Sequence, residues 1–210
     1  MPDPASVLLV VDVQNDFCPG GALPVPSGHE VLPVINALVG RFDNVLLTQD
    51  WHPVGHISFA SSHAERKPFE TVTLAYGPQV LWPDHCVQAT PGAAFHADLR
   101  VPHAQAIVRK GYRAGVDSYS GFIEADRVTP TGLGGYLAAR GLKRIYVVGL
   151  ATDFCVAWTA LDARGLGLEA IVIEDACRGI DAPTVPGGTL AAAWADMAAA
   201  GVVRLRSDQL

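Results

Sequence analysis

The sequence lacks an excess of positive charge. Its 210 residues include 15 Lys and Arg but 21 Asp and Glu, so the formal net charge is −6. Nucleic acids and anionic membranes bind basic surfaces, and neither is expected as the main partner. Long apolar runs are also missing, because the longest, such as residues 7–11, have only the length of a strand. With 50% hydrophobic and 17% charged residues, the chain is expected to be globular, without a membrane-spanning helix.

A signal peptide and a paired-cysteine motif are lacking as well. No basic region precedes the first apolar run, which favours a cytoplasmic location. The four cysteines are spaced neither as a Cys-x-x-Cys redox pair nor as a zinc finger. In a reducing compartment we expect free thiols, of which at least one has a chemical role. These cysteines are Cys18, Cys86, Cys155 and Cys177.

Short apolar segments alternate with helical patterns along most of the chain. Val, Ile and Leu fill the apolar segments almost continuously, which is typical of strands in a parallel sheet that helices cover on both faces. We therefore predict an α/β protein with one domain over residues 1–210. The expected strands are 7–13, 44–48, 106–109, 144–150, 169–174 and 202–205, and the expected helices are 29–40, 132–140, 154–164 and 189–200.

One segment, residues 49–103, breaks this alternation. It is rich in Pro, Gly, His and Trp and shows little periodicity. Loops of this length inside a compact domain are usually functional. We therefore expect this segment to carry part of a functional site.

Cys155 is the first candidate for chemistry. It follows the strand expected at 144–150 and falls in the first turn of the next helical pattern, where Thr152 or Asp153 is a plausible N-cap. Unpaired N–H groups and the helix dipole at such a turn favour a thiolate and can bind a developing oxyanion. A lone cysteine is more often a small buried hydrophobe, so a nucleophile needs further support.

Two ionisable residues end other expected strands. Asp12 ends the first strand and Lys110 the third, and sites of α/β proteins form outside the carboxyl ends of such strands. A carboxylate in an apolar strand is costly unless it is paired, and Lys110 could supply the opposite charge. Taken alone, Asp12 could bond to loop backbone and Lys110 could be solvated. Together with Cys155 they indicate a thiol nucleophile whose proton Asp12 moves.

Metal-ligating side chains follow the second strand. Asp50 and His52 are two residues apart, so they point the same way from an extended chain, and His85 could add a third ligand. His56 or Ser58 could complete the shell, directly or through water. Imidazole combined with carboxylate suits zinc, iron(II) or manganese better than calcium. A network of loop hydrogen bonds explains the spacing of Asp50 and His52 equally well.

Seven segments, taken together and in this order, carry a resemblance to a known family. They are VDVQNDF at 11–17, QDWHP at 49–53, HISFA at 56–60, WPDHC at 82–86, KG at 110–111, YSGF at 119–122 and GLATDFCV at 149–156. The chain resembles the nicotinamidases of the isochorismatase-like cysteine hydrolase superfamily, which include bacterial pyrazinamidases. The metal motif separates such members from relatives that use the same triad without a metal.

The resemblance implies a fold and a site. The fold is a three-layer α/β/α arrangement with a six-stranded parallel sheet in Rossmann-like order. Asp12, Lys110 and Cys155 would form a catalytic triad. One divalent metal ion would be held by Asp50, His52 and His85, with His56 as the best match to a variable fourth position and Ser58 as an alternative that acts through water.

The resemblance also implies how the substrate is held. Phe17 and Trp82 would flank a pyridine ring, with Tyr119 nearby. A cis peptide bond is implied just before Ala151. The N–H groups of Ala151 and Cys155 would bind the oxyanion.

The implied activity is hydrolysis of nicotinamide to nicotinate and ammonia through a thioester, a reaction of NAD salvage, with pyrazinamide as a further substrate. The partner is then a small molecule, and the oligomeric state, including a homo-oligomer, stays open. The sequence leaves three alternatives. One is a related cysteine hydrolase that acts on a carbamoyl or ureido compound. The others are a non-catalytic metal-binding protein on the same fold and a zinc hydrolase that uses metal-bound water.

Overall fold

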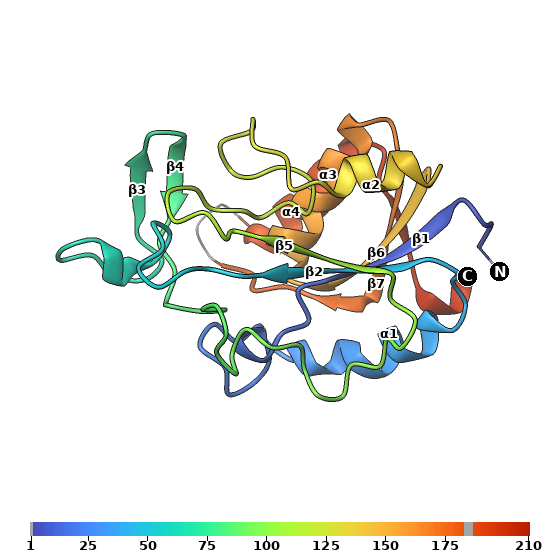
Figure 1. Ribbon diagram of the computed structural model, residues 1–210, viewed down its shortest axis with the longest axis horizontal. Coiled ribbons are helices and arrows are strands. Elements are labelled where there is room, and N and C mark those ends of the chain that lie inside the picture. Colours follow the sequence, from blue (N-terminus) through green and yellow to red (C-terminus); the bar gives the residue numbers. More distant parts are fainter. Residues whose placement is uncertain (1, 183–186) are drawn as a thin grey trace.

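Six parallel strands form the central sheet of the computed structural model in Figure 1, which describes residues 2–182 and 187–210. Their spatial order is β5-β2-β1-β6-β7-β8, so the chain starts near the middle and builds outward on both sides. The predicted six-stranded α/β sheet is confirmed. The strands are β1 (Ser6–Val11), β2 (Val45–Asp50), β5 (Ala106–Lys110), β6 (Arg144–Leu150), β7 (Glu169–Arg178) and β8 (Val203–Leu205).

Helices cover both faces of this sheet (Figure 1). Successive residues of β1 alternate between the two faces. Leu8 and Val10 lie in the core on the side of α1, whereas Val7, Leu9 and Val11 lie in the core on the opposite side. Burial of both faces explains why the strand is an uninterrupted apolar run. The helices are α1 (Val31–Val39) on one face and α2 (Leu133–Ala139), α3 (Ala157–Gly165) and α4 (Thr189–Ala199) on the other.

Several element boundaries differ from those predicted; β7, for example, ends at Arg178 instead of residue 174, and two differences lie at the site. The first strand ends at Val11 instead of residue 13, because Asp12 takes a φ of +48° and the Gln14 N–H donates to the Asp12 carbonyl at 2.8 Å. The helix expected from residue 154 begins at Ala157, after a single π-type turn over Thr152–Val156. Apolar patterns mark which side chains are buried, but backbone hydrogen bonds decide where an element ends.

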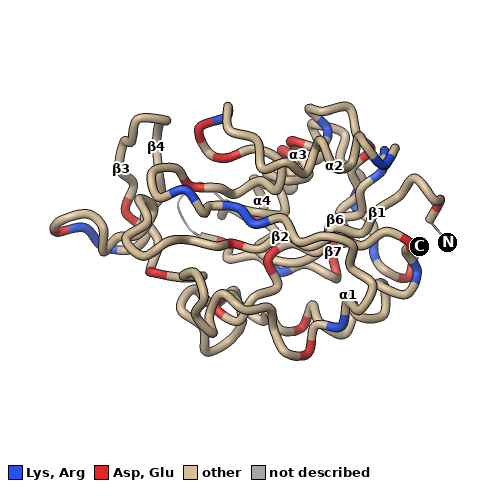
Figure 2. Tube along the Cα trace, in the orientation of Figure 1, with Lys and Arg blue, Asp and Glu red and all other residues tan. Residues whose placement is uncertain are grey.

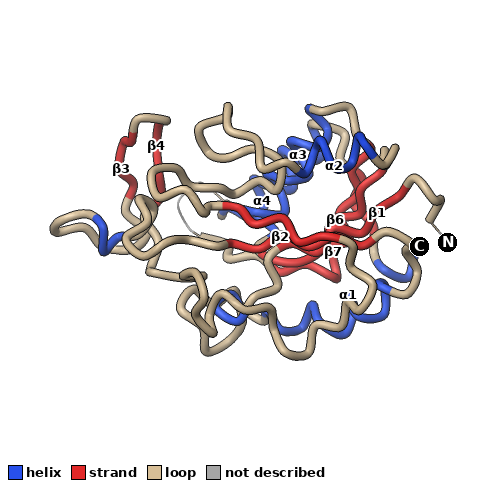
Figure 3. The backbone as a smooth tube through the Cα atoms, viewed as in Figure 1, coloured by secondary structure: helices blue, strands red, loops and turns tan. Residues whose placement is uncertain are grey.

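The long segment between β2 and β5 is mostly loop, as Figure 3 shows. It also contains a hairpin that the sequence did not predict, in which β3 (Thr71–Leu74) and β4 (Gly77–Val80) pair antiparallel. Strands of four residues are too short to show a clear period. Figure 1 shows this hairpin at the end of the molecule opposite both termini.

Charged residues of both signs are spread over the molecule (Figure 2). One of them, Lys110, is wholly buried at the end of β5, which sets it apart from an ordinary solvated lysine. None of the helices within the described ranges combines the length and the apolar character that a bilayer crossing needs.

Candidate active site

Asp12, Lys110 and Cys155 meet at the carboxyl ends of three strands. Asp12 follows β1, Lys110 is the last residue of β5, and Cys155 lies in the turn after β6. Lys110 Nζ is 2.9 Å from Asp12 Oδ2 and 3.4 Å from Cys155 Sγ. All three side chains are buried. The structure therefore brings together the three residues that the sequence suggests as a triad.

Lys110 is the cation of an otherwise acidic cluster. Its Nζ also donates to Asp50 Oδ1, and to the Ser118 carbonyl at 3.0 Å. Burial alone would lower the pKa of Lys110, but the carboxylates of Asp12 and Asp50 outweigh burial and hold that pKa well above its ordinary value. Asp12, Asp50 and Cys155 have ligand atoms within 4.8 Å of one another. Because the ammonium group contacts all three, this cluster is an ion-pair network and not a metal site.

Asp12 has one carboxylate oxygen that can accept a proton. Its Oδ1 accepts a hydrogen bond from Thr48 Oγ1 at 2.7 Å. Its Oδ2 is buried and, apart from the ion pair with Lys110, has no hydrogen-bond partner in the described part of the chain. Burial raises the pKa of Asp12, and Lys110 offsets this only in part. The carboxylate is therefore a stronger base than an exposed aspartate.

Cys155 differs from its predicted state. It lies in the π-type turn before α3, not in the first turn of an α-helix. Burial raises the pKa of its thiol well above the usual value, although Lys110 acts in the opposite direction. Burial therefore works against the thiolate that a helix terminus would favour, because loss of solvent disfavours the charged form. The resting group is a thiol close to the Asp12 carboxylate.

The predicted N-cap is also wrong. The cap position of the turn is Ala151, without a side-chain hydrogen bond, so neither Thr152 nor Asp153 acts as the cap. Asp153 instead accepts hydrogen bonds from the backbone N–H groups of Ile180 at 2.9 Å and Asp181 at 2.8 Å. These partners lie in the segment after β7, so spacing near Cys155 could not reveal them.

Asp50, His52 and His85 form a buried set of metal-ligand atoms. Asp50 Oδ2 is 3.7 Å from His52 Nε2 and 3.9 Å from His85 Nε2. His52 Nδ1 is 2.9 Å from the Gly111 carbonyl and His85 Nδ1 is 2.8 Å from the Pro83 carbonyl. A carbonyl can only accept, so both Nδ1 atoms carry a proton and both Nε2 atoms face Asp50.

The chemistry of this donor set fits a divalent metal. Two imidazoles and one carboxylate are common ligands of zinc, iron(II) and manganese. Burial and the neighbouring His52 lower the pKa of His85 to about 4, so this ring is neutral, as a metal ligand must be. Burial alone would raise the pKa of Asp50, but Lys110 and His52 hold it below its usual value. Burial alone would lower the pKa of His52, but Asp50 raises it above its usual value. The group therefore presents an ionised carboxylate and the lone pair of His85, and a bound metal would displace a proton from His52.

His56, predicted as the fourth ligand, is not brought into this set. Its Nε2 is 3.0 Å from the Arg113 carbonyl and 3.1 Å from the Val116 carbonyl, so this nitrogen donates. Its Nδ1 is 2.7 Å from Ser58 Oγ. Ser58, the predicted alternative to His56, is therefore bonded to His56 itself. The ring lies beside that of His52, with centroids 4.3 Å apart. The 113–116 loop thus occupies Nε2 of His56, and Ser58 occupies Nδ1.

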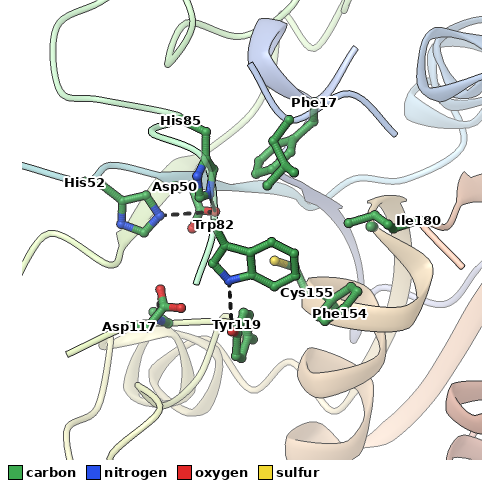
Figure 4. A pocket seen from close by; sticks show the side chains of 13 residues that line it. Phe17, Asp50, His52, Trp82, His85, Asp117, Tyr119, Phe154, Cys155 and Ile180 are labelled. Carbon is green, nitrogen blue, oxygen red and sulfur yellow. Dashed lines mark hydrogen bonds and ion pairs between the residues drawn. The ribbon is translucent and has the colours of Figure 1, made fainter. Parts of the chain in front are cut away.

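Aromatic side chains wall a pocket at Cys155 (Figure 4). The predicted ring-binding residues Phe17, Trp82 and Tyr119 all line it. Trp82 Nε1 donates to Tyr119 Oη at 3.0 Å, and the rings of Trp82 and Phe154 meet edge to face with centroids 5.0 Å apart. In Figure 4 the metal-ligand set lies on one side of Cys155 and Phe154 on the other. A flat aromatic ring would find apolar walls here.

The two residues implied in oxyanion binding border the same pocket. Both Ala151 and Cys155 line it. The peptide bond between Leu150 and Ala151 is cis. The predicted oxyanion residues and the predicted nucleophile therefore face one cavity.

Sequence reasoning missed several polar residues around the pocket. Thr48 lies two residues before Asp50 on β2, so the period of a strand could have placed it on the same face. Gln79 of β4 donates to Asp117 Oδ2 at 2.7 Å and to Tyr119 Oη at 3.0 Å. Asp117 is buried and lines the pocket. Nothing in the sequence places the hairpin against this loop.

Comparison with known proteins agrees with this geometry. The isochorismatase domain model matches residues 6–208. A nicotinamidase from Acinetobacter baylyi is 56% identical over 97% of this chain and 93% of its own length. A solved nicotinamidase and pyrazinamidase from Acinetobacter baumanii is 57% identical, with a TM-score of 0.96 and 100% of both chains covered.

A more distant structure bears on the metal. The pyrazinamidase of Pyrococcus horikoshii, solved in complex with zinc, is 37% identical, with a TM-score of 0.77 and 97% of this chain and 99% of that chain covered. The relatives and the family model extend over nearly the whole chain. On these grounds the protein belongs to the isochorismatase family.

Proposed function

We propose that the protein hydrolyses nicotinamide to nicotinate and ammonia, and pyrazinamide likewise, through a thioester on Cys155. One observation carries this proposal: a single pocket holds a thiol beside a carboxylate base, a three-residue metal set and aromatic walls. The relatives named nicotinamidase match this chain over almost its entire length and support the same activity.

Asp50, His52 and His85 would hold one divalent metal ion in this pocket. When bound, the metal would supply a Lewis acid for the lone pair of the pyridine nitrogen and so orient the carboxamide toward Cys155. Zinc is supported by the zinc complex of the Pyrococcus horikoshii pyrazinamidase, and the same ligands suit iron(II) and manganese. We propose three protein ligands, because both ring nitrogens of His56 are engaged elsewhere.

The first half of the reaction forms the thioester. Asp12 Oδ2 accepts the thiol proton of Cys155, and the charge of Lys110 stabilises the thiolate. The sulfur attacks the amide carbon, and the N–H groups of Ala151 and Cys155 hold the oxyanion. Asp12 then passes the proton to the amide nitrogen, the C–N bond breaks, and ammonia leaves.

The second half releases the acid. Asp12 takes a proton from a water molecule, which attacks the thioester carbon. The C–S bond breaks, the proton returns from Asp12 to the sulfur, and the acid leaves and loses its remaining proton to solvent as nicotinate. Phe17, Trp82 and Tyr119 hold the ring throughout, so the carboxamide carbon stays beside Cys155.

Some expectations stay predictions from the sequence. They include the cytoplasmic location, the single domain over residues 1–210, and independence from nucleic acids and membranes. Homo-oligomer formation is also open. The small-molecule amide is the partner that this pocket supports.

Ammonia release tests the proposed reaction. Metal-depleted protein is supplied with zinc, iron(II) or manganese in turn and is assayed with nicotinamide, pyrazinamide, an N-carbamoyl amino acid and a ureido acid. We expect metal-dependent release from the two aromatic amides, because only they combine a flat ring with a ring nitrogen. Release from a carbamoyl or ureido compound in preference to nicotinamide would overturn the substrate assignment and favour the related cysteine hydrolases.

A further inference from the structure

The sheet has a gap at the site, next to the last residues of β2. β1 pairs with β2 only from Leu8↔Val45 to Val10↔Leu47, because the chain turns away at Asp12. On its other side β2 stays paired with β5 as far as Asp50↔Lys110. Among the described residues, the end of β2 therefore has a strand neighbour on one side only.

The side chain of Gln14 fills this gap. Gln14 Oε1 accepts from the Asp50 N–H at 2.8 Å, and Gln14 Nε2 donates to the Asp50 carbonyl at 2.8 Å and to the Ala93 carbonyl at 2.9 Å. The side chain is wholly buried. A primary carboxamide carries the same donor and acceptor as a peptide group, so Gln14 takes the place of the missing strand against Asp50.

The position of the Asp50 backbone is important because the two carboxylate oxygens of Asp50 have different partners. Its Oδ1 accepts from Lys110 Nζ, whereas its Oδ2 faces His52 and His85. One carboxylate thus joins the ion-pair cluster at Cys155 to the metal-ligand set. A small displacement of the Asp50 backbone would pull at least one of its two oxygens out of place.

We propose that Gln14 is a positioning residue that holds the Asp50 backbone, so that one carboxylate serves the nucleophile cluster and the metal together. This inference rests on the metal site of the proposed function. Gln14 would touch neither metal nor substrate, and its effect would pass through Asp50. Partners that orient metal ligands typically contribute about 10–100-fold to metal affinity.

The test compares Gln14→Met with Gln49→Met. Gln49 is the matched control: it is buried, precedes Asp50 directly and donates to the same Ala93 carbonyl at 2.9 Å, but it makes no side-chain hydrogen bond to the Asp50 backbone. Zinc alone is titrated into each metal-depleted protein in competition with a chelator, and kcat for nicotinamide is measured in saturating zinc. We expect Gln14→Met to raise the Kd for zinc about 10–100-fold and to lower kcat, and Gln49→Met to change the Kd less than about threefold.

Folding is followed by thermal unfolding of the metal-depleted proteins. If Gln14→Met does not fold, Gln14→Asn replaces it, because this variant keeps the amide but withdraws it by one methylene; the same rise in Kd is expected. An unchanged zinc Kd in a folded Gln14 variant, or an equal loss in Gln49→Met, would overturn the inference. Zinc binding needs no nicotinamide, so wild-type protein that binds zinc but releases no ammonia would refute the proposed function alone. Wild-type protein that binds no zinc would refute both.

Discussion

Cys155→Ala is expected to slow ammonia release from nicotinamide by at least about 10⁴-fold, the order found when a catalytic nucleophile is removed. The reason is that Cys155 lines the pocket and its Sγ lies 3.4 Å from Lys110 Nζ, which can stabilise the thiolate. Zinc affinity should stay at the wild-type level, because the sulfur is not part of the set formed by Asp50, His52 and His85. Steady-state ammonia release and chelator competition measure the two quantities on the same preparation.

Cys177→Ala is the matched control for this variant. Cys177 is a buried thiol on β7, and its sulfur lies 4.0 Å from the Val147 carbonyl, outside the pocket. Its removal should leave kcat within a few-fold of wild type. If Cys155→Ala kept comparable activity, the thiol would be a bystander, and a hydrolase that uses metal-bound water would explain the site better.

His52→Ala is expected to lose metal and activity together. The imidazole Nε2 faces Asp50 Oδ2 at 3.7 Å and is one of the three proposed protein ligands, so the Kd for zinc should rise by more than the about 10–100-fold that an outer partner contributes. Activity should fall with metal occupancy and return in part when zinc is raised. Metal content and ammonia release, measured on one titration series, check this prediction.

Two other histidines serve as comparisons. His96 lies in a surface groove away from the pocket, so His96→Ala should match wild type in both readouts. His56→Ala should weaken zinc binding less than His52→Ala, because its ring nitrogens bond to Ser58 and to loop carbonyls instead of facing Asp50. Equal losses in His56→Ala and His52→Ala would restore the fourth-ligand role that the sequence suggested. Full activity of demonstrably metal-free protein would refute the proposed role of the metal in the reaction.

The parts of the site that the sequence predicted are those set by strand ends. Asp12, Asp50 and Lys110 each close an apolar strand, and parallel strands bring their carboxyl ends to one edge. The placement of these side chains therefore follows from local patterns together with one rule about sheet topology. His52 follows in the same way, because an extended chain repeats its direction every two residues.

The parts that the sequence did not predict depend on contacts between distant segments. His56 has the residue type and spacing of a ligand, but its bonds to the Arg113 and Val116 carbonyls decide its role. The state of Cys155 depends on how deeply the folded chain buries it. Gln14 acquires its contact with Asp50 only because β1 ends early relative to β2, which is a matter of register. Contacts between residues that are far apart in the sequence cannot be predicted from the pattern of one segment.

The most direct test of the account is to find the acyl group. Wild-type protein turning over saturating nicotinamide in the presence of zinc is quenched in acid, digested and examined by peptide mass spectrometry. The account predicts a nicotinoyl group on the peptide that contains Cys155, at the cysteine itself, and no such group when zinc is withheld. An unmodified Cys155 in protein quenched during rapid turnover, or a nicotinoyl group on another side chain, would contradict it.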